Sequence, residues 1–255
     1  MARYQLTLAY DGTEFFGSQR QAKRRTVQGE LEKALRTLGW NDRSLLLSGR
    51  TDTGVHATGQ VASVDIEWSH ADADLARALN AKLPMDLSVR TARIVRDDFN
   101  PRFDAISRIY QYRLFFQPAR DPIRERFAWR LPAVLNKNLL VNAARAFLGT
   151  HDFSSFGSPT TPKGTTIRTV ISAEWTQTAR DEWQFEVEAD AFLYRMVRRL
   201  VFLQAAAAQG KLEVEDIVRS LALQHPAGKR SVLPAGLAPA HGLTLASVRY
   251  QESIE

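Results

Sequence analysis

Apolar and polar residues alternate in several short stretches of the chain, and this pattern predicts β-strands. The clearest case runs from Arg3 to Tyr10, where Leu6, Leu8 and Tyr10 take every second position. Similar short stretches predict further strands at 61–66, 87–95, 109–116, 170–178, 184–189 and 243–250.

Elsewhere apolar residues recur every three or four positions, which predicts amphipathic helices. The first begins after Thr26, a residue type favoured at the N-cap, and carries Val27, Leu31 and Leu35 on one face before Gly39 ends it. The same spacing predicts helices at 72–83, 136–148, 192–209 and 213–221. Neither part of the chain has enough strands to cover both faces of a sheet alone. We therefore expect an α+β fold of two similar halves, 1–104 and 105–255, whose mostly antiparallel sheets join across a central basic cleft.

The amino-acid composition excludes several kinds of catalytic and metal site. The chain of 255 residues has no cysteine, which excludes disulfides, thiolate catalysis and cysteine-ligated metals. It has no glycine-rich phosphate loop, no dinucleotide fingerprint, and no metal-ligand spacing among its five histidines. We therefore predict no cofactor and no metal, and chemistry that rests on carboxylates, tyrosines and arginines.

The charge and hydropathy of the chain indicate its kind of binding partner and its location in the cell. The net charge of +6 favours nucleic acid as a partner without deciding it. Two long basic loops, 118–130 and 159–168, are expected to lack order without a partner. No apolar run approaches the roughly 18 residues that span a bilayer, and the N-terminus has no signal-peptide pattern. We therefore expect a cytoplasmic protein without a membrane partner.

One loop stands out as a candidate site: Gly-Arg-Thr-Asp-Thr-Gly-Val-His-Ala at 49–57. Two glycines bracket Asp52, and they permit tight turns and close approach of another backbone. A neighbouring arginine, Arg50, favours the ionised form of this acid. The alternative is a structural turn in which Asp52 caps its own backbone.

This run resembles the G-R-T-D-A-G-V-H-A signature of the tRNA pseudouridine synthase A family, and Thr53 stands where alanine is usual. The resemblance continues through Y-x-L-x-L-x-Y-D-G-x-x-F-x-G at 4–17, although Ser18 stands where tryptophan is usual. Further similar blocks in the same order lie at 26–35, 99–112, 151–156, 192–198 and 238–248. The resemblance implies the pseudouridine synthase fold and conversion of uridine to pseudouridine at positions 38–40 in the anticodon stem-loop of tRNA.

The resemblance also implies roles for particular residues. Asp52 is expected to be the nucleophile or electrostatic stabiliser at C1′ of the ribose. Tyr110 is expected to stack on the flipped uridine and help remove its C5 proton; a core strand tyrosine is the alternative. Arg198 is expected to pair with Asp52 through its guanidinium; a solvated helix edge is the alternative, since Arg195, Arg198 and Arg199 form a basic stripe at helical spacing. Leu245 is expected to line the uracil pocket.

RNA contacts are expected from basic loop residues. Arg50 is expected to contact the phosphate or ribose of the flipped nucleotide, with a local salt bridge as the alternative. Lys23, Arg24 and Arg25 form a loop patch suited to phosphate, and Arg120, Arg124 and Arg126 form another. His56 is expected to be a packed, hydrogen-bonded residue rather than a proton shuttle.

The resemblance also implies a homodimer in which one tRNA spans both subunits. Two other functions are compatible with the basic α+β chain. One is a non-catalytic tRNA-binding module, and the other is a pseudouridine synthase that acts on another RNA.

Overall fold

The protein is described by a computed structural model that covers residues 1–133, 135–161, 164–222 and 233–251. Its contacts divide the chain into two compact units. The first unit comprises Met1–Ile106 together with Thr244–Glu255, and the second comprises Ser107–Leu243. The last strand therefore belongs to the first unit, whereas the predicted halves placed it in the second.

The first unit is built on mostly antiparallel strands in the order β4-β1-β3-β10. The short strand β2 pairs with Ala62 and Ser63 of β3. One pairing is parallel, that of β10 with β3. The predicted alternation of β1 is confirmed, because its every second side chain from Tyr4 to Tyr10 is buried. These strands are β1 (Ala2–Tyr10), β2 (Leu46–Leu47), β3 (His56–Ile66), β4 (Leu87–Ile94) and β10 (Leu243–Tyr250).

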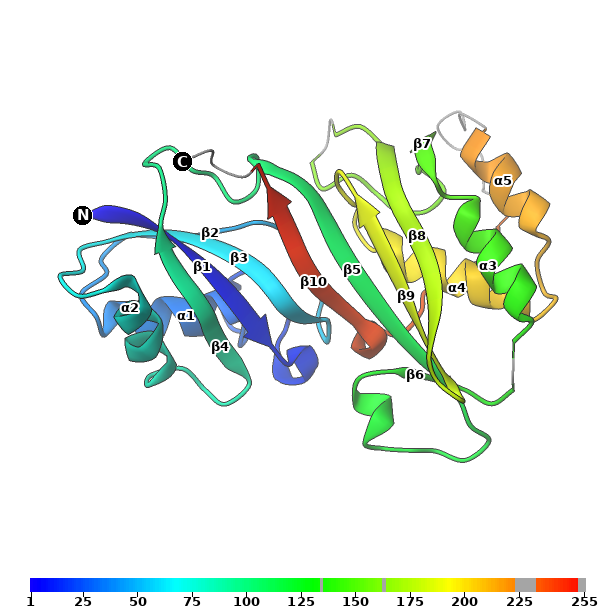
Figure 1. Ribbon diagram of the computed structural model, residues 1–255, viewed down its shortest axis with the longest axis horizontal. Coiled ribbons are helices and arrows are strands. Elements are labelled where there is room, and N and C mark those ends of the chain that lie inside the picture. Colours follow the sequence, from blue (N-terminus) through cyan, green and yellow to red (C-terminus); the bar gives the residue numbers. More distant parts are fainter. Residues whose placement is uncertain (134, 162–163, 223–232, 252–255) are drawn as a thin grey trace. The chain divides into compact units, whose positions relative to one another are not determined.

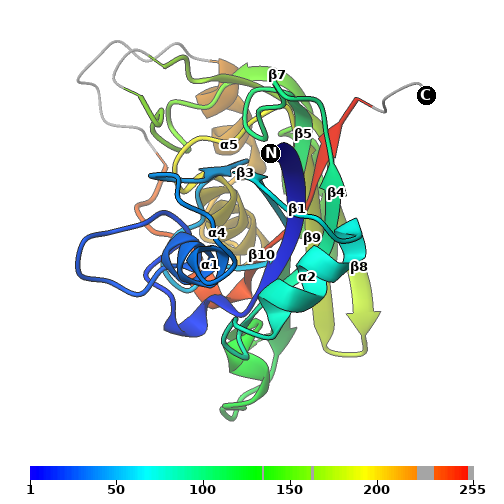
Figure 2. The ribbon, with the colours of Figure 1, turned by 90° about the vertical axis from the view of Figure 1, so that its left-hand side faces the viewer.

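The helices of the first unit follow the predicted amphipathic pattern. Helix α1 (Val27–Arg36) begins where expected, because the Thr26 hydroxyl accepts a hydrogen bond from the Gly29 amide at 3.2 Å. Helix α2 (Asp72–Asn80) lies next to β4 in both views (Figure 1, Figure 2). A short 3-10 helix, η1 (Gly12–Glu14), follows β1 directly.

The strands of the second unit run in the order β5-β9-β8-β7, in which these neighbours are antiparallel. A short strand, β6, adds to β5 in parallel. The strands are β5 (Ala105–Phe116), β6 (Trp129–Leu131), β7 (Gly149–Asp152), β8 (Ile167–Ala179) and β9 (Glu182–Ala189). Each unit thus combines helices with a mostly antiparallel sheet, which confirms the predicted α+β class.

Helices α3 and α4 of the second unit pack against each other, and α3 also contacts β8 (Figure 1). The unit contains α3 (Lys137–Arg145), α4 (Met196–Ala208), α5 (Val214–Ala222), η2 (Arg124–Arg126) and η3 (Ala240–Gly242).

The start of α4 differs from the prediction of a helix from residue 192. The Tyr194 amide donates to the Ser158 carbonyl at 2.8 Å, and Arg195 has a left-handed backbone with φ of 63°. A left-handed residue cannot continue a right-handed helix, so α4 begins at Met196. The predicted basic stripe of Arg195, Arg198 and Arg199 on one helix is therefore wrong, since Arg195 lies outside the helix.

No helix in the described part of the chain is long and apolar enough to cross a membrane.

Candidate active site

The loop that carries Asp52 spans residues 48–55, between β2 and β3, and is called the Asp52 loop below. It ends in a tight turn in which the Val55 amide donates to the Asp52 carbonyl at 3.1 Å. Gly54 takes a positive φ of 79° in this turn, which a glycine adopts without strain. The turn leaves Asp52 half-buried and Thr53 exposed.

The backbone of the Asp52 loop lies against residues 15–18. The Gly54 amide donates to the Phe15 carbonyl at 3.4 Å, and the Ser18 amide donates to the Thr51 carbonyl at 3.1 Å. Gly17 makes this approach possible, because a Cβ at that position would lie 2.8 Å from the Thr51 carbonyl oxygen. The close backbone approach thus depends on Gly17. The sequence assigned it to the glycines that bracket Asp52, but a Cβ at Gly49 would meet nothing within 4 Å.

Thr51, directly before Asp52, is the anchored residue of the loop. Its side chain is buried, and its hydroxyl lies 2.9 Å from the hydroxyl of Tyr10. Burial raises the pKa of Tyr10 to about 12 against the opposing effect of hydrogen bonds, so its hydroxyl stays protonated near neutral pH. This contact is therefore a neutral hydrogen bond.

The first residues of the loop are held by Gln60 of β3. The Ser48 hydroxyl donates to the Gln60 side-chain oxygen at 2.6 Å, and the Gln60 amide group donates to the Gly49 carbonyl at 3.1 Å. Both side chains are buried. Arg50 is exposed, and none of the residues that the structure describes forms an ion pair with it. The alternative of a local salt bridge for Arg50 is therefore not supported.

His56 and Leu245 lie at the end of β3 nearest to the Asp52 loop. The prediction for His56 is confirmed, because it is buried and its Nδ1 accepts a hydrogen bond from the Gly12 amide at 3.0 Å. Leu245 of β10 is opposite Ala57 in the parallel pairing with β3. Its side chain is buried, so it belongs to the apolar surroundings of this strand end.

The basic loop before α1 carries three of the expected RNA contacts. Lys23 and Arg24 are exposed, and the Arg24 guanidinium lies 4.4 Å from the centre of the Phe16 ring. Arg25 differs, because it donates to both oxygens of Asp86 at 2.7 Å. This pair raises the pKa of Arg25 and lowers that of Asp86. The fork of Arg25 thus holds the loop, a role the sequence did not indicate.

A hollow of about 570 Å³ lies between this loop and α1. Buried Glu32 organises it, since it accepts from Arg20 at 2.8 Å and from the Gln28 side chain at 2.9 Å. The charged side chains that line the hollow are Arg20, Lys23, Arg24, Arg25, Glu30, Glu32, Lys33 and Arg36. Six cations against two anions make it suited to an anionic ligand.

Tyr110 lies on β5 of the second unit and is half-buried. Its ring meets Phe192 edge to face, with centroids 5.1 Å apart, which fixes the ring plane. Tyr112, two residues further on the same face, is fully buried and donates its hydroxyl to the Pro239 carbonyl at 2.8 Å. The two tyrosines of the Tyr-x-Tyr pair therefore have different environments, and the fully buried core position is that of Tyr112.

Arg198 of α4 lies on the same side of β5 as these tyrosines. Its Nε donates to the Ala238 carbonyl at 2.8 Å. The Tyr112 hydroxyl donates to the adjacent Pro239 carbonyl, so the two side chains bond neighbouring peptides. Burial raises the pKa of Tyr112 well above its usual value, and the positive charge of Arg198 opposes this rise. Arg198 is half-buried and hydrogen-bonded to the backbone, so the alternative of a solvated helix edge does not describe it.

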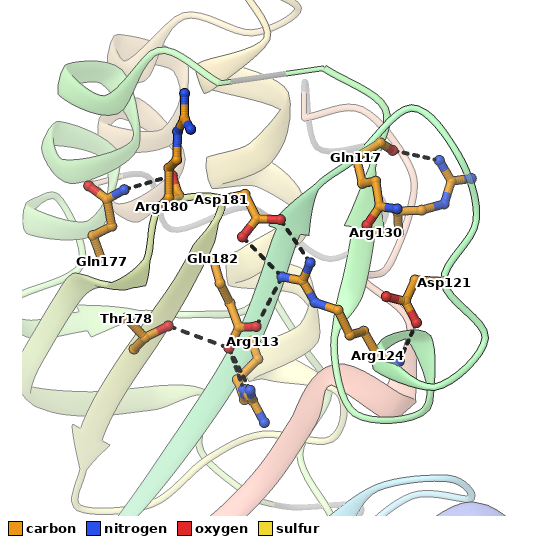
Figure 3. A network of polar contacts seen from close by, with 10 residues as sticks. All are labelled: Arg113, Gln117, Asp121, Arg124, Arg130, Gln177, Thr178, Arg180, Asp181 and Glu182. Atoms are coloured by element: carbon orange, nitrogen blue, oxygen red, sulfur yellow. Dashed lines mark hydrogen bonds and ion pairs between the residues drawn. The ribbon is translucent and has the colours of Figure 1, made fainter.

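Residues 117–130, called the 117–130 segment below, are ordered by ion pairs, so the expectation that 118–130 lacks order is wrong. Arg124 donates to Asp181 at 2.8 Å and to Glu182 at 3.2 Å (Figure 3). Glu125 accepts from Arg120 at 2.8 Å and from Arg130 at 3.1 Å. Arg120 and Arg124 of the expected phosphate patch thus already have carboxylate partners. The other long loop, 159–168, lies partly outside the described residues.

The structure places Asp52, Arg50 and Leu245 in the first unit, and Tyr110 and Arg198 in the second. The approach of Asp52 to Tyr110 and Arg198 therefore stays a prediction. Within the described ranges, no three histidine, aspartate or glutamate side chains gather as metal ligands would.

Three structural roles were missed from the sequence: those of Ser18, Gln60 and Asp86. Each acts on a residue at least 11 positions away, as in the contacts of Ser18 with Thr51, Gln60 with Gly49 and Asp86 with Arg25. Neither periodicity nor local spacing contains a signal for such contacts. A polar residue inside a strand, such as Gln60, is the weak sign that was available.

Comparison with known proteins gives a consistent result. The family model described as tRNA pseudouridine synthase matches residues 7–104 and 143–251. A tRNA pseudouridine synthase A of Solidesulfovibrio magneticus is 41% identical over 256 residues, which cover 98% of this chain and 92% of that protein. Its counterpart in Chloroflexus aurantiacus is 39% identical, covering 96% and 87%. The one in Bacillus licheniformis is also 39% identical, covering 97% and 99%.

Proposed function

The chain belongs to the tRNA pseudouridine synthase family, and from that membership we propose which residues carry its reaction. It is an isomerase that converts uridine in tRNA to pseudouridine. We propose positions 38–40 of the anticodon stem-loop as its targets. The reaction breaks the bond from C1′ to N1 and forms one from C1′ to C5, while C5 loses a proton and N1 gains one. It thus balances without a redox carrier or an energy source.

The observation that carries the proposal is the Asp52 loop itself. It presents a half-buried carboxylate beside an exposed guanidinium, on a backbone tied down by hydrogen bonds at Thr51. Such a carboxylate can attack C1′, or stabilise positive charge there as the glycosidic bond breaks. In this proposal Arg50 contacts the phosphate or ribose of the same nucleotide.

Tyr110 and Arg198 complete the proposed site. The fixed ring of Tyr110 stacks on the uracil, and its hydroxyl takes part in removal of the C5 proton. The Nε of Arg198 is already bonded to the Ala238 carbonyl. The guanidinium therefore pairs with Asp52 through its two terminal nitrogens, which keeps the carboxylate ionised and oriented. Leu245 contributes to the apolar wall of the uracil pocket.

The target uridine must leave its stack to reach a carboxylate, at a cost of a few kcal/mol. Contacts with the RNA backbone offset that cost in our proposal. Lys23 and Arg24 supply exposed charges, and Arg25 adds its charge while it holds the loop through Asp86. We propose further that the enzyme acts in the cytoplasm, and as a homodimer that binds one tRNA across both subunits.

The test is Asp52→Ala, assayed with unmodified tRNA transcripts that carry uridine at position 38, 39 or 40 and with no added cofactor. We expect loss of pseudouridine formation with tRNA affinity retained, because the substitution removes the reacting group and leaves the basic surfaces intact. Asp42→Ala removes an exposed acid of the same unit and should keep full activity. Near wild-type turnover by Asp52→Ala would refute the assignment.

The same assay separates the two other functions. Binding of tRNA by the wild-type protein without any product would favour a non-catalytic tRNA-binding module. Product on ribosomal RNA alone would favour a pseudouridine synthase with another substrate.

A further inference from the structure

Ser18 occupies a position between helix α1 and the Asp52 loop. It is fully buried. Its carbonyl accepts a hydrogen bond from the Gln28 amide at 2.9 Å, in the first turn of α1. Amides in the first turn of a helix have no partner within the helix, so this bond ties Ser18 to the start of α1.

The other two polar atoms of Ser18 hold Thr51. The Ser18 amide donates to the Thr51 carbonyl at 3.1 Å, and the Ser18 hydroxyl oxygen accepts from the Thr51 amide at 2.9 Å. The backbone of Thr51 is therefore gripped at both its N–H and its C=O by one residue. The Thr51 carbonyl belongs to the peptide group that joins Thr51 to Asp52. These two hydrogen bonds therefore hold the backbone directly before the Cα atom that carries the Asp52 side chain.

From this geometry we propose that Ser18 is a positioning residue for Asp52, and that its hydroxyl sets the orientation of the carboxylate for attack at C1′. The inference rests on the proposed function of Asp52. Side chains that react must be held to within a fraction of an ångström, and supporting hydrogen bonds provide this precision. Removal of the Ser18 hydroxyl would take away the acceptor to which the Thr51 amide donates.

The test is Ser18→Ala, measured for kcat, for KM with a tRNA transcript, and for the exchange rate of the Thr51 amide hydrogen. We expect kcat to fall about 10- to 100-fold, because a displacement of the order of 1 Å near the reacting centre costs about that much. The KM for tRNA should stay within about twofold, since no basic surface changes. The Thr51 amide should exchange faster.

Asn80→Ala is the matched control. The Asn80 side chain also accepts from a backbone amide, that of Val89, at 2.8 Å, and it donates to the Val89 carbonyl at 2.8 Å; both bonds lie in the same unit but beside the edge strand β4. The control therefore removes the same kind of bond, and a second one, away from the Asp52 loop, so kcat should stay near wild type even if the melting temperature falls. Ser18→Cys puts a somewhat larger thiol in place of the hydroxyl and keeps a weak acceptor, so it should restore part of kcat relative to Ser18→Ala.

Three results would overturn the inference. The first is an unchanged kcat in Ser18→Ala, the second is a raised KM in that variant with kcat unchanged, and the third is an equal fall of kcat in Asn80→Ala. If Ser18→Ala does not fold, Ser18→Cys must show the loss in kcat at unchanged KM, and wild-type kcat in that variant would refute the proposal. Failure of this inference leaves the Asp52→Ala result intact. Turnover by Asp52→Ala would instead refute the proposed function itself.

Discussion

The Asp52 loop and the 117–130 segment both connect strands, yet different interactions hold them. Buried, neutral hydrogen bonds hold the Asp52 loop, through Tyr10, Ser18 and Gln60. Guanidinium–carboxylate pairs near the surface hold the 117–130 segment: those of Arg124 with Asp181 and Glu182 (Figure 3), and those around Glu125. Neutral buried bonds respond little to pH or salt, whereas exposed ion pairs respond to both.

The difference shows which region of the chain is held in a precise geometry. A loop that must present one carboxylate in one orientation benefits from bonds that are costly to break, since a buried donor left without its acceptor costs about 1–3 kcal/mol. A surface segment can rely on pairs worth about 0–1 kcal/mol each. We therefore expect substitutions to disturb the first region most, and solution conditions to disturb the second.

Among the changes that compare these two regions, the largest effect is expected for Tyr10→Phe, which removes the hydroxyl partner of Thr51. The free energy of unfolding should fall by about 1–2 kcal/mol, because the buried Thr51 hydroxyl loses its partner. We also expect a several-fold fall in kcat, smaller than for Ser18→Ala, since the backbone of Thr51 stays gripped. Denaturant unfolding and single-turnover kinetics measure the two quantities.

Tyr4→Phe is the control for that substitution, because Tyr4 is buried on the same strand but at its far end from the Asp52 loop. It should alter stability without altering kcat. If both variants reduced kcat equally, the Tyr10 hydroxyl would have no specific role in holding the loop.

A smaller effect, confined to the other region, is expected from acid. The hydrogen bond from Arg120 leads the interactions that lower the pKa of Glu125 to about 2 from its usual 4.5. A carboxyl group whose pKa is lowered by folding stabilises the fold above its usual pKa, and that contribution is lost as pH falls through the folded value. The Glu125 contacts should therefore weaken progressively from about pH 4.5 to about pH 2.

The side-chain carbon resonance of Glu125 in NMR spectra gives its titration midpoint, and the amide signals of Asp121 and Arg124 report the order of the segment. Glu125→Gln should weaken the same contacts at neutral pH, because it removes the charge without changing the shape. A Glu125 midpoint near 4.5 would show that the ion pairs do not hold the segment.

The sequence predicted most of the fold because periodicity is a local property. Strand β1 and the start of helix α1 lie where alternation and an N-cap threonine placed them. The start of α4 was wrong because a hydrogen bond from Tyr194 to a residue 36 positions away, Ser158, overrides the apolar pattern. Local pattern contains no information about such a contact.

Part of the candidate site could also be predicted. The motif pointed to Asp52 and Arg50 as candidates, and the expectation that His56 is packed and hydrogen-bonded is confirmed. What the motif did not contain is the support behind it. Ser18 entered only as a departure from the family pattern, although its contacts with Thr51 give it a physical role. That role depends on a loop that passes within hydrogen-bond distance only after folding.

The smallest effect is expected from salt on the protein without RNA. At about 1 M salt the Debye length falls to about 3 Å, so the exposed pair of Arg120 with Glu125 is screened. Screening one such pair should loosen the 117–130 segment by well under 1 kcal/mol, seen as faster amide hydrogen exchange there. Exchange at Thr51 should not change, because its partners are buried and neutral. RNA must be absent, since salt also weakens phosphate contacts steeply and would mask this difference. Faster amide exchange at Thr51, or no increase of the exchange rate in the 117–130 segment, would mean that the two regions are not held by different kinds of interaction.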